Sequence, residues 1–396
     1  MRRRYERLLA THFSGDRQMA FLSGPRQVGK TTTSRAFTEK QIYFSWENED
    51  HQRLILSGPT AVADAIGLTR VQTIVFDELH KYTQWKTFIK GFFDTYESRR
   101  FRIVVTGSAR LDAYRKGADS LMGRYFLYRM HPLSVAEIVS TCRTEGEISA
   151  PGSIGNSDFK ALIHFGGFPE PWLKRDLRFY RRWKTTRLKL LFREELRDTT
   201  RIQEIGQVEL LAEFMRRQSG QLMNYASLAR KIRASQDSIR RWVSVLESLY
   251  HCFLLRPWTR NIPRSLLKDP KVYLWDWSVL DDRGAVHENL VACHLLKAVH
   301  WWQDCGYGDY DLHFLRTKEK REVDFVVSRN GKPWFLVEVK STADSNPLRN
   351  LTYFQEKTGA EHAFQVIIDA DYVDADSFDV NHPVRVPART FLSQLI

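Results

Sequence analysis

Cysteine is scarce in this sequence of 396 residues, and its four cysteines form no C-x-x-C pair. Free thiols in a reducing cytosol explain Cys142, Cys252, Cys293 and Cys305. Long apolar runs are also missing, because no stretch approaches the roughly 18 apolar residues of a membrane span. Residues 1–7 are basic, but the apolar run of a secretory signal does not follow them. These absences predict a cytoplasmic protein with no membrane contact.

Acidic residues are outnumbered, with 47 Asp or Glu against 60 Lys or Arg and a formal charge of +13. The excess is concentrated between Pro171 and Arg260, which contain 20 basic and 9 acidic residues. A basic segment within a folded chain favours a polyanionic partner, most simply nucleic acid, although a merely soluble basic surface has the same composition. The hydrophobic content of 43% indicates a folded chain, and the length allows two or three domains.

The most specific motif lies near the start of the chain, where residues 24–31 match the P-loop pattern G-x-x-x-x-G-K-S/T. A short apolar stretch, residues 19–23, precedes it and predicts a buried strand, and residues 32–39 contain neither Gly nor Pro and predict a helix. In this context the loop amides would face phosphate oxygens, Lys30 would contact the β- and γ-phosphates, and Thr31 would ligate Mg²⁺. A Gly-containing turn that matches by chance is the alternative. The predicted ATP-binding residues are Gly24, Pro25, Arg26, Gln27, Val28, Gly29, Lys30, Thr31 and Thr32.

A second motif follows the apolar stretch 71–76, which ends in Asp77 and Glu78. This is the Walker B arrangement, in which Asp77 would hold Mg²⁺ through water and Glu78 would polarise the attacking water. Residues 101–108 predict another buried strand, which in AAA-type ATPases lies between the other two and carries a polar side chain near the γ-phosphate. Ser108 is the first candidate for that sensor and Thr106 the second, with an ordinary strand-end turn as the alternative.

Hydrolysis by this class needs an arginine near the γ-phosphate, supplied by the same chain or by a neighbouring subunit. Arg124 follows a Gly near the end of the predicted domain and is the candidate, although it and Arg110 could equally form structural salt bridges. Strands that alternate with helices predict a parallel sheet whose site lies at the carboxyl ends of its strands.

These motifs resemble a widespread prokaryotic group of AAA-type ATPases with a C-terminal domain of unknown function. The resemblance rests on residues 24–32, 77–81, 106–108, 123–134 and 166–170, and it extends over nearly the whole chain. It implies an AAA-type ATPase that uses ATP and Mg²⁺, a helix-turn-helix unit in the middle of the chain, and a restriction-endonuclease-like C-terminal domain. It implies little about the biological role.

The middle of the chain is mostly helical by its pattern. Residues 178–201 are rich in Lys and Arg interleaved with apolar residues, which suits a solvated helix face or a surface for nucleic acid or a partner. The pattern indicates a helix-turn-helix formed by residues 224–232 and 235–242, with Ser235 as N-cap of the second helix. Its core face would be Ile239, Trp242, Val243, Leu246 and Leu249, and its outward residues Gln236, Asp237, Arg240 and Arg241. Such units read DNA, but they also serve as lids or dimer contacts.

Carboxylates and a lysine gather in the C-terminal region. The predicted strands 322–327 and 332–340 are joined by a short connection, so they should pair as a hairpin that brings Asp324 close to Glu338. Glu338 and Lys340 are two residues apart and share a strand face, and Glu288 on a preceding helix could supply a further carboxylate. The set resembles the D-x(n)-E-x-K nuclease core, in which Asp324, Glu338 and Glu288 would bind metal while Glu338 and Lys340 take part in catalysis. A hairpin with a surface Glu-Lys pair, and a nuclease fold that binds without cutting, are the alternatives.

The sequence therefore predicts an α/β fold, with a P-loop parallel sheet, a helical winged-helix middle region and a restriction-endonuclease-like α/β domain. The predicted boundaries are an AAA-type ATPase domain at residues 1–140, a helical linker or lid at 157–205, a winged-helix-like domain at 206–262 and the nuclease-like domain at 265–396. The predicted function is a Mg²⁺-dependent ATPase coupled to a domain that acts on or binds nucleic acid. The alternative is a nucleotide-gated switch that recognises DNA or a protein without cleavage. A homo-oligomer is compatible with either.

Overall fold

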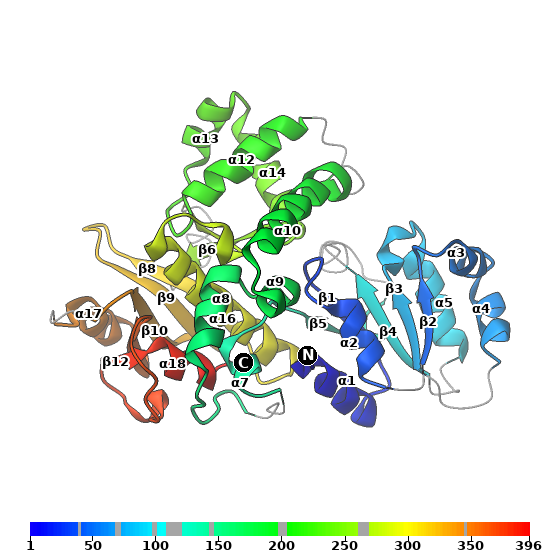
Figure 1. The fold of residues 1–396 in the computed structure, drawn as a ribbon, viewed down its shortest axis with the longest axis horizontal. Coiled ribbons are helices and arrows are strands. Elements are labelled where there is room, and N and C mark those ends of the chain that lie inside the picture. The colour runs from blue at the N-terminus through cyan, green and yellow to red at the C-terminus, as the bar shows by residue number, and fades with distance from the viewer. Residues whose placement is uncertain are drawn as a thin grey trace. The chain divides into compact units, whose positions relative to one another are not determined.

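The chain divides into two compact units in a computed structural model (Figure 1). The first unit contains residues 1–131 and 141–144, and the second contains residues 132–140 and 145–396. The structure describes residues 1–38, 41–67, 73–96, 101–107, 121–141, 146–196, 204–259, 269–343 and 347–396. Among the helices described, none combines the length and apolar character that a membrane crossing requires. The predicted ranges 157–205, 206–262 and 265–396 all fall in the second unit.

The first unit is built on a five-stranded parallel sheet with the order β2-β3-β4-β1-β5. Its strands are β1 (Met19–Ser23), β2 (Gln41–Ser45), β3 (Thr73–Asp77), β4 (Arg102–Gly107) and β5 (Tyr125–Arg129). The P-loop strand β1 and the Walker B strand β3 both pair with β4, so the predicted strand order is confirmed. Strand β5 pairs with the other edge of β1 and was not predicted from the sequence.

Helices cover both faces of this sheet. Helices α3 (Glu49–Leu56), α4 (Pro59–Ile66) and α5 (Trp85–Tyr96) bury Ile55, Val62 and Phe92 against the face that carries Phe21 and Phe76. On the other face, α1 (Arg4–Gly15) lies beside α2 (Lys30–Ala36), and α2 packs on β3 and β4. A short turn, η1 (Leu79–Lys81), follows the Walker B strand. The parallel arrangement places the carboxyl ends of β1, β3 and β4 at one edge, which is where the P-loop begins.

The second unit is built on a seven-stranded mixed sheet with the order β12-β11-β10-β9-β8-β6-β7. Its strands are β6 (Cys252–Pro257), β7 (Lys271–Leu274), β8 (Tyr310–Arg316), β9 (Glu322–Arg329), β10 (Lys332–Lys340), β11 (His362–Ile367) and β12 (Val384–Pro387). Strands β9 and β10 form the predicted antiparallel hairpin, whereas β10, β11 and β12 run parallel. Strand β6 pairs with β8, so β6 and β7 extend the sheet across the sequence boundary predicted near residue 262.

Helices pack on both faces of this sheet. Neighbouring residues of β10 point to opposite faces, so each of them packs against a different helix. Leu336 packs with Leu351 and Phe354 of α17 (Arg349–Thr358) on one face. Phe335 contacts Phe391 of α18 (Ala388–Gln394) on the other face. Helix α16 (Arg283–Asp304), the predicted helix that carries Glu288, packs on β8, β9 and β10. Two short 3₁₀ turns, η4 (Trp277–Val279) and η5 (Ser377–Asp379), complete the connections.

Seven helices precede this sheet in the described part of the second unit. They are α7 (Val135–Val139), α8 (Asn156–Phe165), α9 (Pro169–Lys174), α10 (Leu177–Leu190), α12 (Ile205–Arg217), α13 (Tyr225–Ile232) and α14 (Gln236–Ser248). Helix α10 continues into a π-helical turn, η3 (Leu191–Glu195). Helices α13 and α14 occupy the two predicted helix-turn-helix segments, and the Ser235 hydroxyl accepts a hydrogen bond from the Ser238 N–H, which confirms the predicted N-cap.

A buried ion pair ties the start of this unit to its longest helix. Lys297 of α16 and Glu137 of α7 are 2% and 0% exposed, and their charged atoms are 2.5 Å apart. Lys297 also donates to the Pro132 carbonyl and to the Ser134 hydroxyl, each at 3.0 Å. The Ser134 hydroxyl in turn donates to the carbonyl of Ile396. The three hydrogen bonds of the ammonium satisfy a cation that would otherwise be costly to bury.

Candidate functional site

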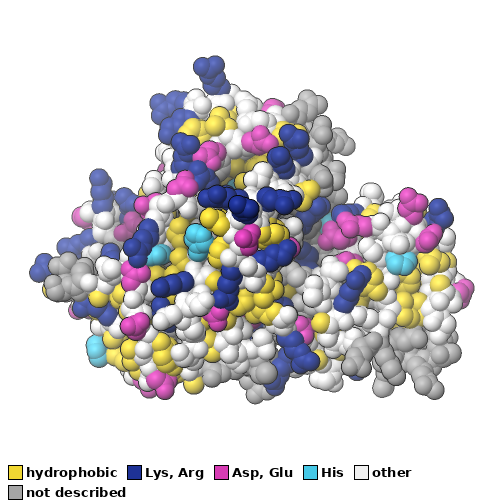
Figure 2. Space-filling model, in the orientation of Figure 1, with side chains coloured by type: hydrophobic (Ala, Val, Ile, Leu, Met, Phe, Trp, Pro, Cys, Tyr) yellow, Lys and Arg dark blue, Asp and Glu magenta, His cyan; other side chains and the backbone are white. Residues whose placement is uncertain are grey.

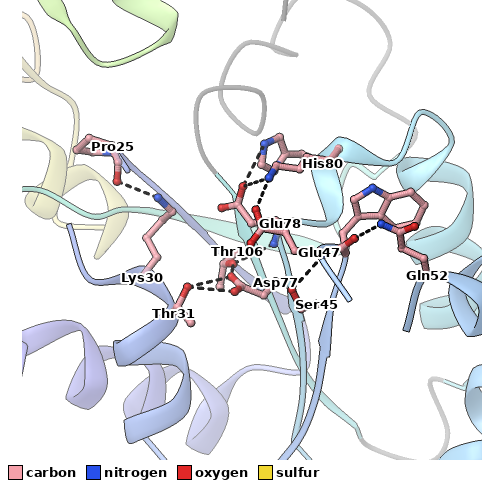
Figure 3. A network of polar contacts seen from close by, with 12 residues as sticks. Pro25, Lys30, Thr31, Ser45, Glu47, Gln52, Asp77, Glu78, His80 and Thr106 are labelled. Atoms are coloured by element: carbon pink, nitrogen blue, oxygen red, sulfur yellow. Dashed lines mark hydrogen bonds and ion pairs between the residues drawn. The ribbon is translucent and has the colours of Figure 1, made fainter. Parts of the chain in front are cut away.

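The P-loop curls between β1 and α2 with backbone angles that require glycine. Gly24 has φ +150°, and a Cβ atom added there would lie 2.3 Å from the Met130 carbonyl oxygen, so no larger residue fits. Gly29 has φ +102° and forms the N-cap of α2. The buried Lys30 ammonium donates to the carbonyl oxygens of Gly24 at 2.8 Å and Pro25 at 2.9 Å, so it lies over the loop (Figure 3). The loop therefore has the geometry of a phosphate cradle with a cation beside it.

A cation outside the motif supports the loop from α1. Arg3 precedes that helix and is 5% exposed. Its guanidinium donates to the Val28 carbonyl at 2.5 Å and to the His131 carbonyl at 2.7 Å. The fork of Arg suits two acceptors at once, so Arg3 connects the loop to the end of the first unit. Sequence reasoning missed this contact, because the basic residues 1–7 carry no motif.

Three hydroxyl groups converge on the Walker B acid Asp77 at the end of β3. Thr31 donates to its two carboxylate oxygens at 3.0 and 3.3 Å (Figure 3). Thr106 of β4 and Tyr43 of β2 donate to the same carboxylate. Burial and the neighbouring Asp77 raise the pKa of Tyr43, so its hydroxyl stays protonated as a donor. Thr31 and Asp77 were both predicted as magnesium ligands, and the fold brings their oxygens together.

Glu78, the predicted water-polarising residue, follows in a left-handed conformation with φ +55°. Its N–H donates to the Thr106 hydroxyl at 3.4 Å. Its carboxylate lies 3.8 Å from the His80 ring (Figure 3). The Lys81 ammonium is 3.6 Å from the same carboxylate. Lys81 also contacts Glu47 at 2.5 Å. Thr106 therefore links the Asp77 carboxylate to the backbone of Glu78, while two basic side chains lie close to the Glu78 carboxylate.

The structure describes some, but not all, of the remaining predicted residues of the first unit. Ser108 and Arg110 lie outside the described residues. Arg124 forms a bidentate pair with Asp94 of α5, at 2.6 and 3.0 Å, and these hydrogen bonds lower the pKa of Asp94. Arg26 is partly buried, whereas Gln27 and Thr32 are exposed. The salt-bridge alternative for Arg124 thus has a defined partner in this structure.

In the second unit, the β9–β10 hairpin brings Asp324 next to the strand that carries Glu338. Phe325 lies opposite Val337, and Asp324 accepts a hydrogen bond from the Val339 N–H at 2.8 Å. Burial, followed by repulsion from Glu288, raises the pKa of Asp324 to about 7. The predicted proximity of Asp324 and Glu338 is confirmed. Glu338 lies 3.1 Å from the Lys340 ammonium and accepts from Gln365 of β11 at 3.3 Å.

Glu288 of α16 makes its contacts with the edge strand β7. It accepts from the Tyr273 hydroxyl at 2.7 Å, and it lies 3.4 Å from the Lys271 ammonium. Lys271 is 3% exposed and also contacts Glu322 at 2.5 Å. Within the described part of the chain, no three His, Cys, Asp or Glu residues are grouped to hold a metal ion. Sequence reasoning missed Lys271, because β7 joins this sheet only through tertiary pairing.

The helix-turn-helix segments present a basic surface. The predicted outward residues of α14 are exposed, and the predicted core residues Ile239, Trp242, Val243, Leu246 and Leu249 are buried. Arg230, Lys231 and Arg233 add exposed charge at the end of α13. Figure 2 shows Lys and Arg side chains gathered over the region of α12–α14. Arg240 lies 4.2 Å from the centre of the Tyr225 ring, so this cation is also packed against the surface.

The sheet order, the loop and the paired Thr31 and Asp77 together define a P-loop ATPase fold of the AAA type in the first unit. Comparison with known protein families agrees, because residues 16–139 match the family described as AAA domain. Residues 156–282 and 283–387 match two families described as domains of unknown function, DUF8612 and DUF4143. Three families thus match consecutive parts of the chain.

The curated relatives and solved structures that are similar to this chain are distant. Uncharacterized proteins of Mycobacterium tuberculosis and Mycobacterium bovis are each 25% identical over 351 residues, which cover 84% of this chain and 72% of theirs. A Walker-type ATPase of Pyrococcus abyssi is 15% identical, with a TM-score of 0.43 over 68% of this chain and 92% of its own. The ORC1 protein of Aeropyrum pernix, solved in complex with DNA, is 14% identical, with a TM-score of 0.28 over 73% of this chain and 90% of its own.

Proposed function

We propose that this chain is a Mg²⁺-dependent ATPase whose C-terminal α/β domain acts on or binds nucleic acid. The observation that carries the ATPase half is the hydrogen bond between Thr31 of the P-loop and Asp77 of the Walker B strand, at 3.0 Å. A hydroxyl and a carboxylate at one point suit Mg²⁺, which prefers oxygen ligands. When bound, the ion would neutralise charge that develops on the phosphates. Residues 24–32 would hold the nucleotide, with Lys30 at the β- and γ-phosphates.

Glu78 would then orient the attacking water, and its N–H bond to Thr106 supports a fixed position for its backbone. Ser108 stays the first candidate for the γ-phosphate sensor. Arg124 stays the candidate arginine, and it would act from a neighbouring copy only if its pair with Asp94 opened. A homo-oligomer follows from this proposal if hydrolysis depends on that arginine.

The ATPase half is tested by ATP hydrolysis with Mg²⁺, comparing the wild type with Lys30→Ala. The matched control is Arg102→Ala, which removes an exposed cation at the first residue of β4, away from the carboxyl ends of the strands. We expect Lys30→Ala to lose turnover while Arg102→Ala keeps it. Equal turnover in the two variants would contradict the assignment of the P-loop.

The nucleic-acid half rests on the C-terminal carboxylates and on the basic helix-turn-helix surface. Asp324 and Glu338 offer oxygen ligands for a divalent ion, and Lys340, whose ammonium lies 3.1 Å from Glu338, could stabilise charge in the transition state. Glu288 stays a possible further ligand. The exposed cations of α13 and α14 suit the phosphate backbone of DNA. ATP binding would control whether this domain engages its substrate.

A second function is favoured by the contacts of Glu288. Its partners are Lys271 and Tyr273, and the described residues form no three-ligand metal group. A C-terminal domain in which Glu288 and Glu338 are already paired with lysines suits recognition without cleavage. The chain would then be a nucleotide-gated switch that a DNA or protein partner reads.

Cleavage of plasmid and single-stranded DNA separates the two functions. The reactions contain Mg²⁺ or Mn²⁺, with and without ATP, and compare the wild type with Lys340→Ala. Cutting that disappears in the variant would establish the nuclease and show whether ATP controls it. Intact ATP turnover with no cutting, together with salt-sensitive DNA binding, would establish the switch.

A further inference from the structure

A cavity of about 270 Å³ lies between α8, the end of β11 and α18, all within the second unit. Four of its lining residues come from one face of α8, at helical spacing: Asn156, Phe159, Lys160 and Ile163. The others are Ile368, Asp369, Asp371 and Arg389. None of these residues belongs to the P-loop or to the Asp324 and Glu338 pair, so the cavity is a separate feature.

Arg389 is the charged centre of this cavity. It is only 8% exposed, and its Nε atom has no hydrogen-bond partner among the residues that the structure describes. Its Nη1 atom donates to Asn156, and its guanidinium lies 4.9 Å from the centre of the Phe159 ring. The carboxylate of Asp371 is 4.0 Å away and 94% exposed, so it neutralises the cation poorly. A buried cation with an unused donor favours an anion in the adjoining space.

The first turn of α8 adds a second source of positive potential. Gly155 is its N-cap and offers no side chain to the free N–H groups of the helix. Asp158 lies in the same turn, but its carboxylate pairs with Arg175 at 2.5 Å. Lys160 follows Asn156 by four residues and brings an ammonium to the same helix face. Helix N-termini and cations on one surface favour bound oxyanions.

The rest of the lining limits the size and the charge of a ligand. Phe159, Ile163 and Ile368 give the cavity an apolar wall. The volume is below the roughly 300 Å³ at which pockets for drug-sized ligands begin. Asp369 is paired with Arg283 at 2.7 Å, so its carboxylate is directed toward that cation. A small molecule with one oxyanion group and a short apolar part matches these walls.

We propose that this cavity binds a small ligand through a carboxylate or phosphate group, with Arg389 as its main contact. The positive charge of the Arg389 guanidinium would hold the oxyanion, assisted by Lys160 and Asn156. The apolar part of the ligand would lie against Ile163 and Ile368. This site is independent of the ATPase and nuclease-like functions and would give the second unit a metabolite-binding activity.

Isothermal titration of the full chain with inorganic phosphate, and separately with butyrate, tests the proposal, with a non-hydrolysable ATP analogue present in excess so that the P-loop does not take up the probe. We expect saturable binding of at least one probe, and the stronger probe identifies the oxyanion. Because a charge-assisted hydrogen bond is lost, Arg389→Met should weaken that binding by about ten- to hundredfold. Lys332→Met, which removes an exposed cation at the start of β10, is the matched control and should bind as the wild type does.

A second variant keeps the proposal testable if Arg389→Met fails to fold. Ile163→Trp fills the cavity without removing a charge, and it should also abolish binding while thermal unfolding shows an intact fold. The proposal is overturned if neither probe binds up to about 10 mM, which corresponds to less than 3 kcal/mol of affinity. It is also overturned if folded Arg389→Met or Ile163→Trp binds the probe as tightly as the Lys332→Met control.

Discussion

Glu247 gives the second unit a stability that depends on pH. It lies near the end of α14, and burial raises the pKa of its carboxyl from 4.5 to about 7. The Leu254 N–H donates to this carboxyl at 3.2 Å, and the charge of Arg256 is nearby, both of which favour the ionised form. The effect of burial is larger than the effects of Leu254 and Arg256, so ionising Glu247 near neutral pH destabilises the folded protein.

The direction in which pH changes the free energy of unfolding follows from the protonation of Glu247 in the folded and unfolded chains. Between about pH 4.5 and 7 the folded Glu247 stays protonated while the unfolded one is ionised, so the folded state binds more protons. The contribution of Glu247 to the free energy of unfolding therefore falls as pH rises through this window. The difference of pKa corresponds to about 3 kcal/mol lost by pH 7 and above.

Replacing Glu247 by Gln removes the charge but keeps a carbonyl that can accept from Leu254. We expect Glu247→Gln to raise the free energy of unfolding by up to about 3 kcal/mol near pH 8, and by little near pH 4. Urea unfolding followed by tryptophan fluorescence measures this, because Trp242 and Trp275 are buried in the same region. The contributions of other titrating groups, including His251 and His294, to the free energy of unfolding cancel when the variant is compared with the wild type at each pH.

Two results would refute this reasoning. One is a stability difference that is the same at every pH, which would mean that Gln changes packing and not charge. The other is a loss of stability in Glu247→Gln near pH 8, which would mean that the ionised carboxylate is favourable in the folded state. Only the second result would show that Leu254 and Arg256 outweigh burial.

Further predictions concern the P-loop and the buried ion pair. Gly24→Ala should abolish binding of a fluorescent ATP analogue, because its Cβ would lie 2.3 Å from the Met130 carbonyl; Gly15→Ala, with open space around its Cβ, should bind normally. Lys297→Met should lower the free energy of unfolding by about 3–5 kcal/mol, because the buried carboxylate of Glu137 would lose the ammonium group that pairs with it. Adding Glu137→Leu should recover most of that loss in urea unfolding, whereas an equal loss in the double variant would contradict the pair as the cause.

The sequence predicts the first unit well because its signals are local. The P-loop glycines and the acids after β3 follow directly from residue order, and the parallel order of strands follows from the fold class. Tyr43 was missed because its role depends on the β2–β3 register, in which Ser45 lies beside Asp77. Strand β5 was missed because it is an edge strand in which only Tyr128 of its five residues is buried.

The second unit was predicted in parts and not as a whole. The α13–α14 caps and the β9–β10 hairpin have short-range patterns, so their residues could be placed. Lys271 and Lys297 could not, because their acidic partners lie 17 residues or more away along the chain and come together only in the packed fold. The same applies to β6, whose pairing with β8 joins segments that the sequence assigned to separate domains.

The carboxylate of Asp77 and the carboxylates of the C-terminal site have different kinds of partner. This difference affects which site would attract a divalent cation. The direct partners of Asp77 are three hydroxyl groups, which orient the carboxylate without neutralising it. Glu338 and Glu288 instead have the ammonium groups of Lys340 and Lys271 within 3.4 Å. Full charges compensate a carboxylate far more than dipoles do, so among the described residues a cation must compete with lysine in the second unit, whereas the contacts of Asp77 are with hydroxyl groups. Of the two proposed metal sites, the P-loop site would on these contacts hold a divalent cation more tightly, and the C-terminal site would need its lysines to move before it could do so.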